Sequence, residues 1–445
     1  MKNKVLTGLL LVLIGGWGSL SAQSAGSNYS RQVNTLIGTK GVGLTSGYLY
    51  PGATYPYGMV QFTPSYFSKR SGFVINQLSG GGCEHMGNFP TFPVKGKLKM
   101  SPDNILNYRI NISEEKGHAG YYEAMVQEDI KAKLTVTERT GMASYEYPAD
   151  QQYGTVIIGG GISATPIEQA AIVITAPNKC EGYAEGGNFC GLRTPYKVYF
   201  VAEFDTDALE SGTWKRNELK PNTTFAEGEY SGVYFTFDVN KKKNIQYKIG
   251  VSYVSVENAR ENLKAENTGW DFLQIQNQAE SKWNHYLGKI EVEGTNPDRT
   301  TQFYTHLYRS FIHPNVCSDV NGEYMGADFK VHKSRSKHYT SFSNWDTYRT
   351  QIQLLSILDP EVASDIVISH QLFAEEAGGA FPRWVMANIE TGVMQGDPTP
   401  ILISNAYAFG ARNYDPKPIF KTMRKGAEEP GAMSQEVEAR PGLKQ

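Results

Sequence analysis

Hydrophobic and polar positions follow two different periods along the chain. Up to about residue 257, short runs rich in β-branched and aromatic residues are separated by Gly, Pro and Asn. In the run 131–137, Ala132, Leu134 and Val136 alternate with polar neighbours, which is typical of a strand with one buried face. Similar runs occur at residues 196–204, 234–239 and 245–254. Many short strands without helical patterns between them predict an antiparallel β-sandwich over residues 27–257.

After residue 257 the apolar positions recur at helical spacing. One stripe of an amphipathic helix consists of Phe272, Ile275, Ala279, Trp283 and Tyr286. Its steps of three and four predict a linker helix over residues 258–294. Asp-Pro pairs at 359–360 and 415–416 predict two further helix starts, because Asp caps a helix and Pro suits its first position. The pattern therefore predicts an α+β multidomain chain that is all-α from about residue 258.

The first 22 residues have the pattern of a secretory signal peptide. Lys2 and Lys4 precede an apolar stretch, and small residues including Ala22 offer a cleavage site. No later segment approaches the roughly 20 apolar residues that a bilayer span needs, so we expect no transmembrane segment in the mature chain. Export to the periplasm or beyond the cell is the predicted localisation.

Charge and cysteine content narrow the classes of function. The formal net charge is −2, which argues against nucleic acid as a partner. The 27 tyrosines suit half-buried sheet faces and sugar-stacking clefts. Four cysteines, at 83, 180, 190 and 317, allow three complete pairings. Cys180 and Cys190 flank the glycine-rich segment 181–189 and could close it as a loop, but the sequence does not choose among the pairings.

Four segments carry candidate chemistry. In residues 79–90, three glycines precede Glu84 and His85, an acid and an imidazole that could contact a ligand. A purely structural loop is the alternative there. Residues 339–349 place Trp345 beside Asp346 and Arg349 at the start of a helix.

A tryptophan ring can stack on a sugar, while carboxylate and guanidinium groups can bind its hydroxyls. A buried Trp345 beside a helical ion pair is the alternative. Two loops between helices add Trp384 and Asp397, and Asp397 before Pro398 could instead be a helix cap.

Six motifs, in order along the chain, resemble those of glycoside hydrolase family 92. They are V-N-x-x-I-G-T at 33–39, P-G-A-x-x-P-x-G-M at 51–59, S-G-x-G-C at 79–83, S-x-W-D-x-x-R at 343–349, P-x-W at 382–384 and M-x-G-D-P at 394–398. The family consists of secreted, calcium-dependent, exo-acting α-mannosidases. The resemblance implies a β-sandwich, a linker helix and an (α/α)6 toroid, with the active site between the two domains.

The resemblance also implies a reaction and its partners. The expected activity is inverting hydrolysis that releases mannose from mannose-containing glycans such as N-glycans or mannans, with Ca²⁺ binding the sugar hydroxyls. Trp345, Asp346 and Arg349 would line the terminal sugar subsite, with Trp384 and Asp397 in nearby loops. Glu84 and His85 would lie on loops facing it, although the family's histidine before the S-G segment is missing from residues 73–78.

Length is the main departure from the family pattern. A twelve-helix toroid needs roughly 300 residues or more at mean helix and loop lengths, whereas residues 295–445 offer about half of that. We therefore expect a partial toroid, with the catalytic carboxylates and main calcium ligands beyond Gln445. A non-catalytic, secreted glycan-binding remnant is the alternative, and a glycosidase or lyase of another toroid family is a third. Five side chains are expected at the unclosed side: Phe303, Leu307, Ile352, Leu355 and Ile366.

Overall fold

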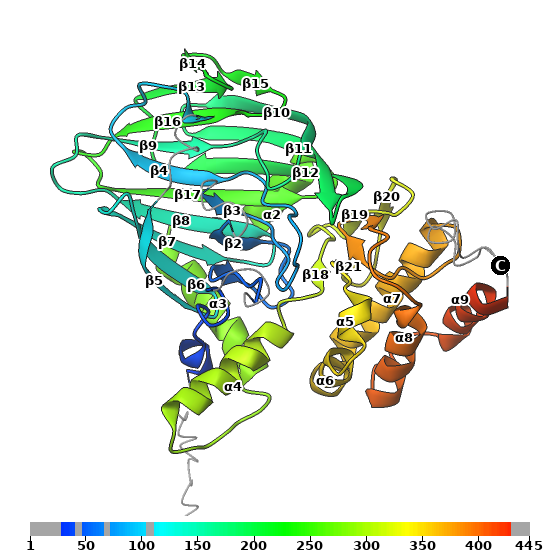
Figure 1. The fold of residues 1–445 in the computed structure, drawn as a ribbon. Helices are drawn as coiled ribbons and strands as arrows, with labels where there is room; N and C mark the ends of the chain where they lie inside the picture. Colours follow the sequence, from blue (N-terminus) through cyan, green and yellow to red (C-terminus); the bar gives the residue numbers. More distant parts are fainter. Residues whose placement is uncertain (1–27, 41–46, 66–71, 104–110, 429–445) are drawn as a thin grey trace, which may run out of the picture.

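The chain folds into a two-sheet β-sandwich followed by a helical region (Figure 1). The computed structural model describes residues 28–40, 47–65, 72–103 and 111–428. The expected signal peptide, residues 1–22, lies outside these ranges. In Figure 1 the sandwich leads through α3 to α4 on one side, and α5 to α9 lie on the other.

Both large sheets in the described residues are antiparallel. One has the order β1–β2–β3–β4–β9–β16–β13–β14, with bounds Ala53–Thr54, Gln61–Pro64, Phe73–Val74, Thr91–Lys95, Tyr153–Ile158, Ser231–Asp238, Glu210–Lys215 and Glu218–Pro221. The other has the order β15–β10–β11–β12–β17–β8–β7–β6–β5, with bounds Phe225–Glu227, Ile167–Ala176, Lys179–Phe189, Leu192–Phe204, Asn244–Ser252, Thr140–Glu146, Ile130–Val136, Tyr121–Val126 and Ile112–His118.

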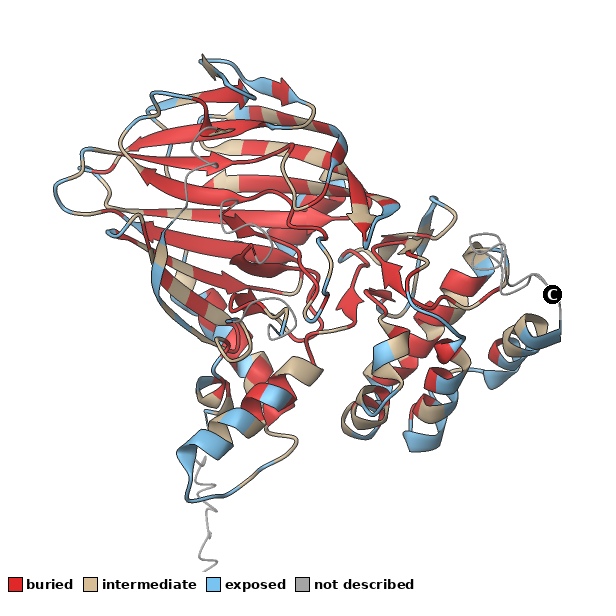
Figure 2. Ribbon diagram, in the orientation of Figure 1, coloured by how far each residue is buried: buried red, intermediate tan, exposed pale blue. Residues whose placement is uncertain are grey.

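Alternation along the strands builds the core between the sheets. In β7, Ala132 and Leu134 are fully buried, and in β12 Val198 and Phe200 are likewise buried. Because successive side chains of a strand point to opposite faces, these residues meet the inner face of the other sheet. Figure 2 shows the buried residues running through both layers. The four predicted strand runs are confirmed as β7, β12, β16 and β17.

The predicted linker helix is two helices rather than one. α2 spans Val256–Glu266 and α3 spans Phe272–Leu287. Gly269 lies in the break, and the Asp271 side chain caps α3 by accepting a hydrogen bond from the backbone of Gln274 at 3.0 Å. α2 packs closely on the outer face of the nine-stranded sheet, since a Cβ on Gly250 would lie only 2.5 Å from the Ala259 carbonyl oxygen.

The stripe on α3 is confirmed as its buried face. Ala279 and Trp283 are fully buried, and the Trp283 indole N–H donates to the Thr54 carbonyl at 2.7 Å. This contact joins α3 to β1 of the sandwich. It also satisfies the polar edge of a buried aromatic ring, which would otherwise lose a hydrogen bond to water.

The helical region contains short strands as well as helices, so the all-α prediction is wrong. Its helices are α4 (Pro297–Ser310), α5 (Asn344–Thr347), α6 (Gln351–Leu358), α7 (Pro360–Glu376), α8 (Pro398–Phe409) and α9 (Pro416–Glu428). Its strand pairs are β18–β21 (Asn315–Val316, Tyr339–Thr340), β19–β20 (Glu323–Met325, Val331–Lys333) and β22–β23 (Val385–Met386, Ile389–Glu390). Both Asp-Pro helix starts are confirmed, at α7 and α9. The strand pairs were missed because each strand is only two or three residues long.

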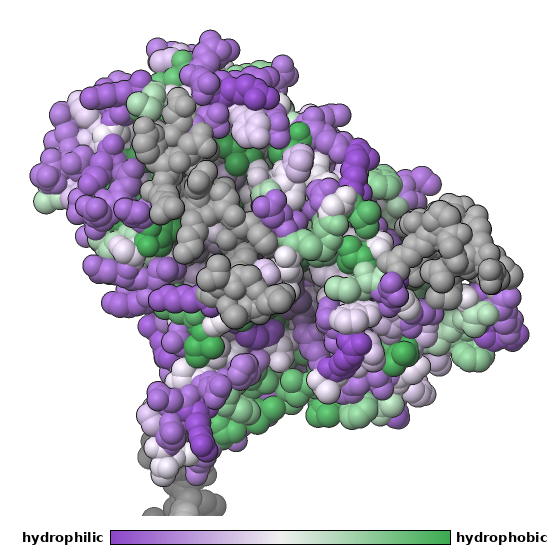
Figure 3. All heavy atoms as spheres, viewed as in Figure 1, coloured by the Kyte–Doolittle hydropathy of each residue, from purple (hydrophilic) through white to green (hydrophobic). Residues whose placement is uncertain are grey.

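Four of the five side chains expected at an unclosed side of the toroid are buried instead. Leu307, Ile352, Leu355 and Ile366 are each at most 5% exposed, because α6 packs between α7 and α8 and α4 packs on α3. The exposed apolar side chains on α6, α8 and α9 are others: Ile357, Ile401, Tyr407, Phe409 and Phe420. Figure 3 shows hydrophobic residues along the lower edge of this view.

A buried polar network joins the sandwich to the helical region. The Asp319 carboxylate accepts hydrogen bonds from Ser252 Oγ at 2.6 Å, Asn258 Nδ2 at 2.8 Å and Asn262 Nδ2 at 2.6 Å. Burial raises the pKa of Asp319, and the three hydrogen bonds oppose that rise. The three donors lie on β17 and α2, whereas Asp319 follows β18, so one carboxylate connects three elements.

Arg139 reinforces the same junction from the β7–β8 turn. Its guanidinium forms ion pairs with Glu266 of α2 at 2.7 Å and with Glu138 at 2.5 Å, and its Nε donates to the Ser318 carbonyl at 2.7 Å. The arginine is only 6% exposed, so these contacts form away from bulk water.

We predict that Asp319→Ala destabilises the fold strongly. The substitution leaves three buried donors without their acceptor, which costs about 3 kcal/mol or more in the free energy of unfolding. Urea unfolding of the 445-residue chain measures this loss. Asp207→Ala, at an exposed carboxylate between β12 and β13, is the matched control and should change the free energy by less than about 0.5 kcal/mol. Equal stability of the two variants would refute the anchoring role of Asp319.

Candidate functional site

The sequence motifs of the two halves meet where the sandwich contacts the helical region. The glycine-rich loop 79–83 is joined to the β11–β12 turn by a disulfide between Cys83 and Cys190, whose Cα atoms are 5.2 Å apart. Next to this disulfide, Phe189 at the end of β11 packs on Trp384, with ring centroids 4.6 Å apart. A buried aromatic pair therefore packs the loops of the sandwich against those of the helical region.

The pairing of Cys180 with Cys190 does not form. The segment between them is the strand β11, Lys179–Phe189, and not a closed loop. At about 3.3 Å per residue, a strand separates residues 180 and 190 by roughly 30 Å, far beyond the reach of a disulfide. Cys180 instead faces the core as a free thiol, as Cys317 does in the helical region, and burial raises the pKa of each.

Backbone hydrogen bonds hold two of the helical motifs side by side. The Asn344 amide donates to the Arg383 carbonyl at 3.1 Å, and the Val385 amide donates to the Phe342 carbonyl at 2.9 Å. The Asn344 side chain donates to Thr399 Oγ1 at 2.7 Å, which adds the start of α8 to the group. The segments 343–349, 382–384 and 397–399 are therefore neighbours in space although they are far apart in the sequence.

Trp345 and Arg349 contact each other directly. The Arg349 guanidinium lies 4.3 Å from the centroid of the Trp345 ring and donates to the Trp345 carbonyl at 2.9 Å. Asp346 is exposed and accepts a hydrogen bond from Ser343 Oγ. A sugar ring stacked on this face of Trp345 would have to displace the guanidinium.

Glu84 and His85 have different surroundings. Glu84 is exposed at the surface of the glycine-rich loop. His85 is buried, and its Nε2 accepts a hydrogen bond from the Leu78 amide at 2.8 Å while its Nδ1 lies 2.7 Å from the Cys83 carbonyl. Burial lowers the pKa of His85 to about 4. Of the two, only Glu84 is available to a ligand in solution.

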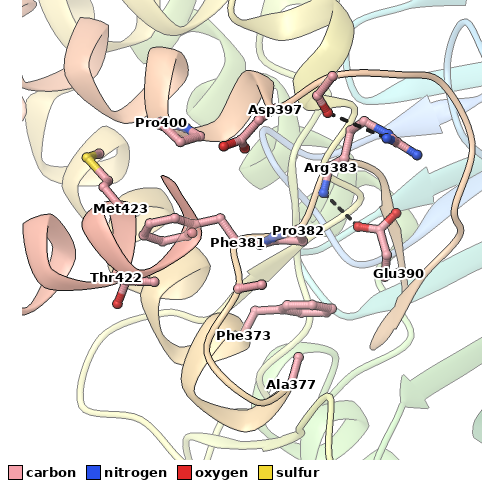
Figure 4. Close-up of a pocket in the computed structure, with 13 residues that line it drawn as sticks. Phe373, Ala377, Phe381, Pro382, Arg383, Glu390, Asp397, Pro400, Thr422 and Met423 are labelled. Carbon is pink, nitrogen blue, oxygen red and sulfur yellow. Dashed lines mark hydrogen bonds between the residues drawn. The ribbon is translucent and has the colours of Figure 1, made fainter. Parts of the chain in front are cut away.

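A small pocket with a cavity volume of about 40 Å³ lies between α7, α8, α9 and the loop before β22 (Figure 4). Phe373, Phe381 and Met423 form its apolar wall, and Arg383, Glu390 and Asp397 are its charged residues. Asp397 stands at the N-terminal end of α8, but its side chain makes no capping hydrogen bond. Burial raises the pKa of Asp397, and the nearby Arg383 opposes that rise. Asp397 therefore occupies the N-cap position of α8 without capping the helix through its side chain.

Glu390 and Arg383 fix the loop that carries Trp384, and sequence reasoning missed both. The Glu390 carboxylate accepts hydrogen bonds from the backbone amides of Arg383 at 2.6 Å, Trp384 at 3.2 Å and Gly392 at 2.9 Å. Arg383 Nε donates to the Val393 carbonyl at 2.6 Å. Burial raises the pKa of Glu390. The position of Arg383 inside the P-x-W motif was the only signal for these contacts in the sequence.

The described residues do not provide a calcium site. Among them, no group of three or more His, Cys, Asp or Glu side chains is placed to hold a metal ion. Because Ca²⁺ takes six to eight oxygen ligands, the described residues do not fit this ion. Within the same residues, no helix is both long and apolar enough to cross a membrane.

Two family models match nearly the whole chain. Residues 32–252 match the glycosyl hydrolase family 92 N-terminal domain, and residues 258–445 match the glycosyl hydrolase family 92 catalytic domain. A protein of Arthroderma benhamiae described as an uncharacterized secreted glycosidase is 26% identical over 363 residues, which cover 72% of this chain and 45% of that protein.

Solved structures with the same fold come from Bacteroides thetaiotaomicron. A family 92 α-mannosidase superposes with a TM-score of 0.82 at 24% identity, covering 90% of this chain and 57% of its own. A family 92 inverting mannosidase gives a TM-score of 0.78 at 23% identity, covering 93% and 58%. The chain thus spans little more than half the length of these structures, and its helical region corresponds to part of their fold.

We predict that acid destabilises the fold through buried histidines. Burial lowers the pKa to about 4 for His85, His313 and His370 and to about 3 for His338. An unfolded histidine takes up its proton near pH 6.5, so stability is complete above that pH and falls as the pH drops from about 6.5 to 4. Each histidine contributes a slope of about 1.4 kcal/mol per pH unit in this window.

Urea unfolding between about pH 7.5 and 4.5 measures the slope. His370→Gln should reduce the slope of the free energy of unfolding by the contribution of one histidine. His306→Gln, at an exposed position on α4, should leave the slope unchanged. A free energy of unfolding that stays constant across this range would contradict the prediction.

Proposed function

The chain belongs to glycosyl hydrolase family 92, and from that premise we propose that it is the N-terminal portion of a secreted, exo-acting, inverting α-mannosidase. The substrates would be mannose-containing glycans such as N-glycans or mannans. Support for secretion comes from the signal-like residues 1–22, the disulfide and the secreted relative.

The observation that carries the proposal is the convergence of motifs at the junction of the two halves. Trp345 and Asp346 lie on α5, and Arg349 follows two residues after it. Trp384 lies beside them through the pairing of its backbone with Ser343. The sandwich adds the disulfide-bonded glycine-rich loop, and its Phe189 packs on Trp384 in the buried interface. An aromatic face next to a carboxylate and a guanidinium suits a pyranose, which has one apolar face and a rim of hydroxyl groups.

We assign roles in binding, but not in bond cleavage, to the described residues. Inversion needs a protonated carboxyl at the leaving oxygen and a second carboxylate that activates water, about 6.5–9.5 Å away. Glu390 does not fit either role, because three backbone amides already occupy its oxygens. We therefore propose that the catalytic pair, and the calcium ligands implied by the family, belong to the length of the family fold that this chain does not span.

Hydrolysis assays on two forms of the protein test this division. We expect the 445-residue chain to release no mannose from α-1,2-, α-1,3-, α-1,4- or α-1,6-linked mannobiose. A form extended to the length of the solved relatives should release it in a calcium-dependent manner. Calcium-dependent activity in the short form at the level of the long form would refute the proposed location of the catalytic carboxylates.

Calorimetric titration with mannobiose tests the proposed binding role of the described residues. We expect Trp345→Ala to weaken binding about tenfold, or about 1.4 kcal/mol, because the stacking face is lost. Trp270→Ala, at a half-buried tryptophan between α2 and α3, is the matched control and should bind as the original chain does. Binding without hydrolysis in both forms of the protein would favour the alternative of a glycan-binding remnant.

A further inference from the structure

Two histidines from different halves of the molecule accept hydrogen bonds from two consecutive backbone amides. The Leu78 amide donates to His85 Nε2 at 2.8 Å, and the Ser79 amide donates to His313 Nε2, also at 2.8 Å. His85 belongs to the sandwich, whereas His313 lies between α4 and β18 at the start of the helical region. The Leu78 amide directly precedes the glycine-rich loop 79–83 of the candidate site, and the Ser79 amide is the first within it.

The partners of the other ring nitrogens fix one tautomer for both histidines. His85 Nδ1 lies 2.7 Å from the Cys83 carbonyl, which only accepts. His313 Nδ1 lies 2.6 Å from Asn315 Oδ1, and the Asn315 amide nitrogen donates elsewhere, to the Gly58 and Ile312 carbonyls. Each Nδ1 must therefore carry the proton and each Nε2 must accept. An imidazolium has no free lone pair and could not hold either amide.

The surroundings favour the neutral form of both rings. Burial lowers the pKa of each to about 4. The charged groups facing His313 are Arg309 of α4 and, when protonated, His85, and both disfavour a second positive charge. The arrangement is therefore complete at neutral pH.

The hydrogen bonds of the Leu78 and Ser79 amides fix the start of the glycine-rich loop 79–83. Gly80 follows with a φ of +83°, and its amide donates to the Tyr48 carbonyl at 2.9 Å. The loop ends at Cys83, which is bonded to Cys190 beside Phe189 and Trp384. On the other side, His313 is close to β18, which pairs with β21 just before Ser343. His313 is thus the point where the helical region holds the glycine-rich loop directly.

We propose that His313 is a positioning residue that, as the neutral Nδ1–H tautomer, sets the glycine-rich loop of the sandwich against the helical side of the glycan site, with His85 holding the preceding amide. The part concerning glycan affinity rests on the proposed function. The part concerning the loop does not.

NMR spectroscopy of the 445-residue chain tests the loop. Long-range nitrogen–proton correlations of the imidazole rings should give the Nδ1–H tautomer for His85 and His313 at neutral pH. His313→Phe should raise the hydrogen-exchange rate of the Ser79 amide at least tenfold, or about 1.4 kcal/mol. His313→Gln, which can offer an acceptor oxygen, should restore much of the protection. His306→Phe is the matched control on α4, and its Ser79 amide should exchange as in the original chain.

Mannobiose titration of the same variants tests the consequence for the site. We expect about tenfold weaker binding for His313→Phe and partial rescue for His313→Gln. Unchanged Ser79 exchange in His313→Phe, or an Nε2–H tautomer at His313 in the original chain, would overturn the proposal, and the tautomer measurement stands even if His313→Phe fails to fold. If the original chain binds no mannobiose, the proposed function fails while the exchange data still decide the role of His313.

Discussion

The arrangement of the two halves depends on a few buried polar groups. Because these groups are buried, water cannot replace a hydrogen-bond partner that they lose. Asp319 is only 2% exposed, and its carboxylate joins β17 and α2 to the segment after β18. An apolar contact would tolerate sliding, because the hydrophobic effect has no direction. Hydrogen bonds to one carboxylate fix both distance and angle, since each donor left unpaired in the interior is costly. The helical loops therefore face the sandwich loops in one defined register.

Within that register, the candidate site is supported by its surroundings rather than by isolated side chains. Glu390 accepts hydrogen bonds from the backbone of the Trp384 loop, and Asn344 connects the starts of α5 and α8. The disulfide links two loops of the sandwich. Groups that are free to meet a ligand, such as Asp346 and Glu84, lie at the surface of this support. This division suits ligand binding. The exposed groups that contact a ligand cost little to desolvate, and the residues that support them are held by hydrogen bonds and the disulfide.

Local patterns in the sequence predicted the parts of the fold that local physics determines. Alternation in the strands, the stripe on α3 and the Asp-Pro helix starts each depend on neighbours within a few residues, and all are confirmed. Contacts between segments that are far apart in the sequence left no such local pattern. The partner of Cys190 was decided by the strand between 180 and 190, and the burial of Ile352 and Ile366 by the packing of α6 on α7 and α8. The family motifs indicated which segments would meet, but they did not indicate that Arg349 stacks on Trp345 or that His85 is enclosed.

The disulfide has a consequence for how the chain matures. A chain synthesised from its N-terminus presents Cys83 first, then Cys180 and only afterwards Cys190, so the native bond skips the cysteine that appears next. Oxidation in order of appearance would join the wrong pair. The pairing of β10, β11 and β12 removes that competitor, because it buries Cys180 completely while leaving Cys190 exposed in the turn of the β11–β12 hairpin. Correct cross-linking is thus a product of sheet assembly, and an oxidant that acts before the sheet forms would act as a misfolding agent.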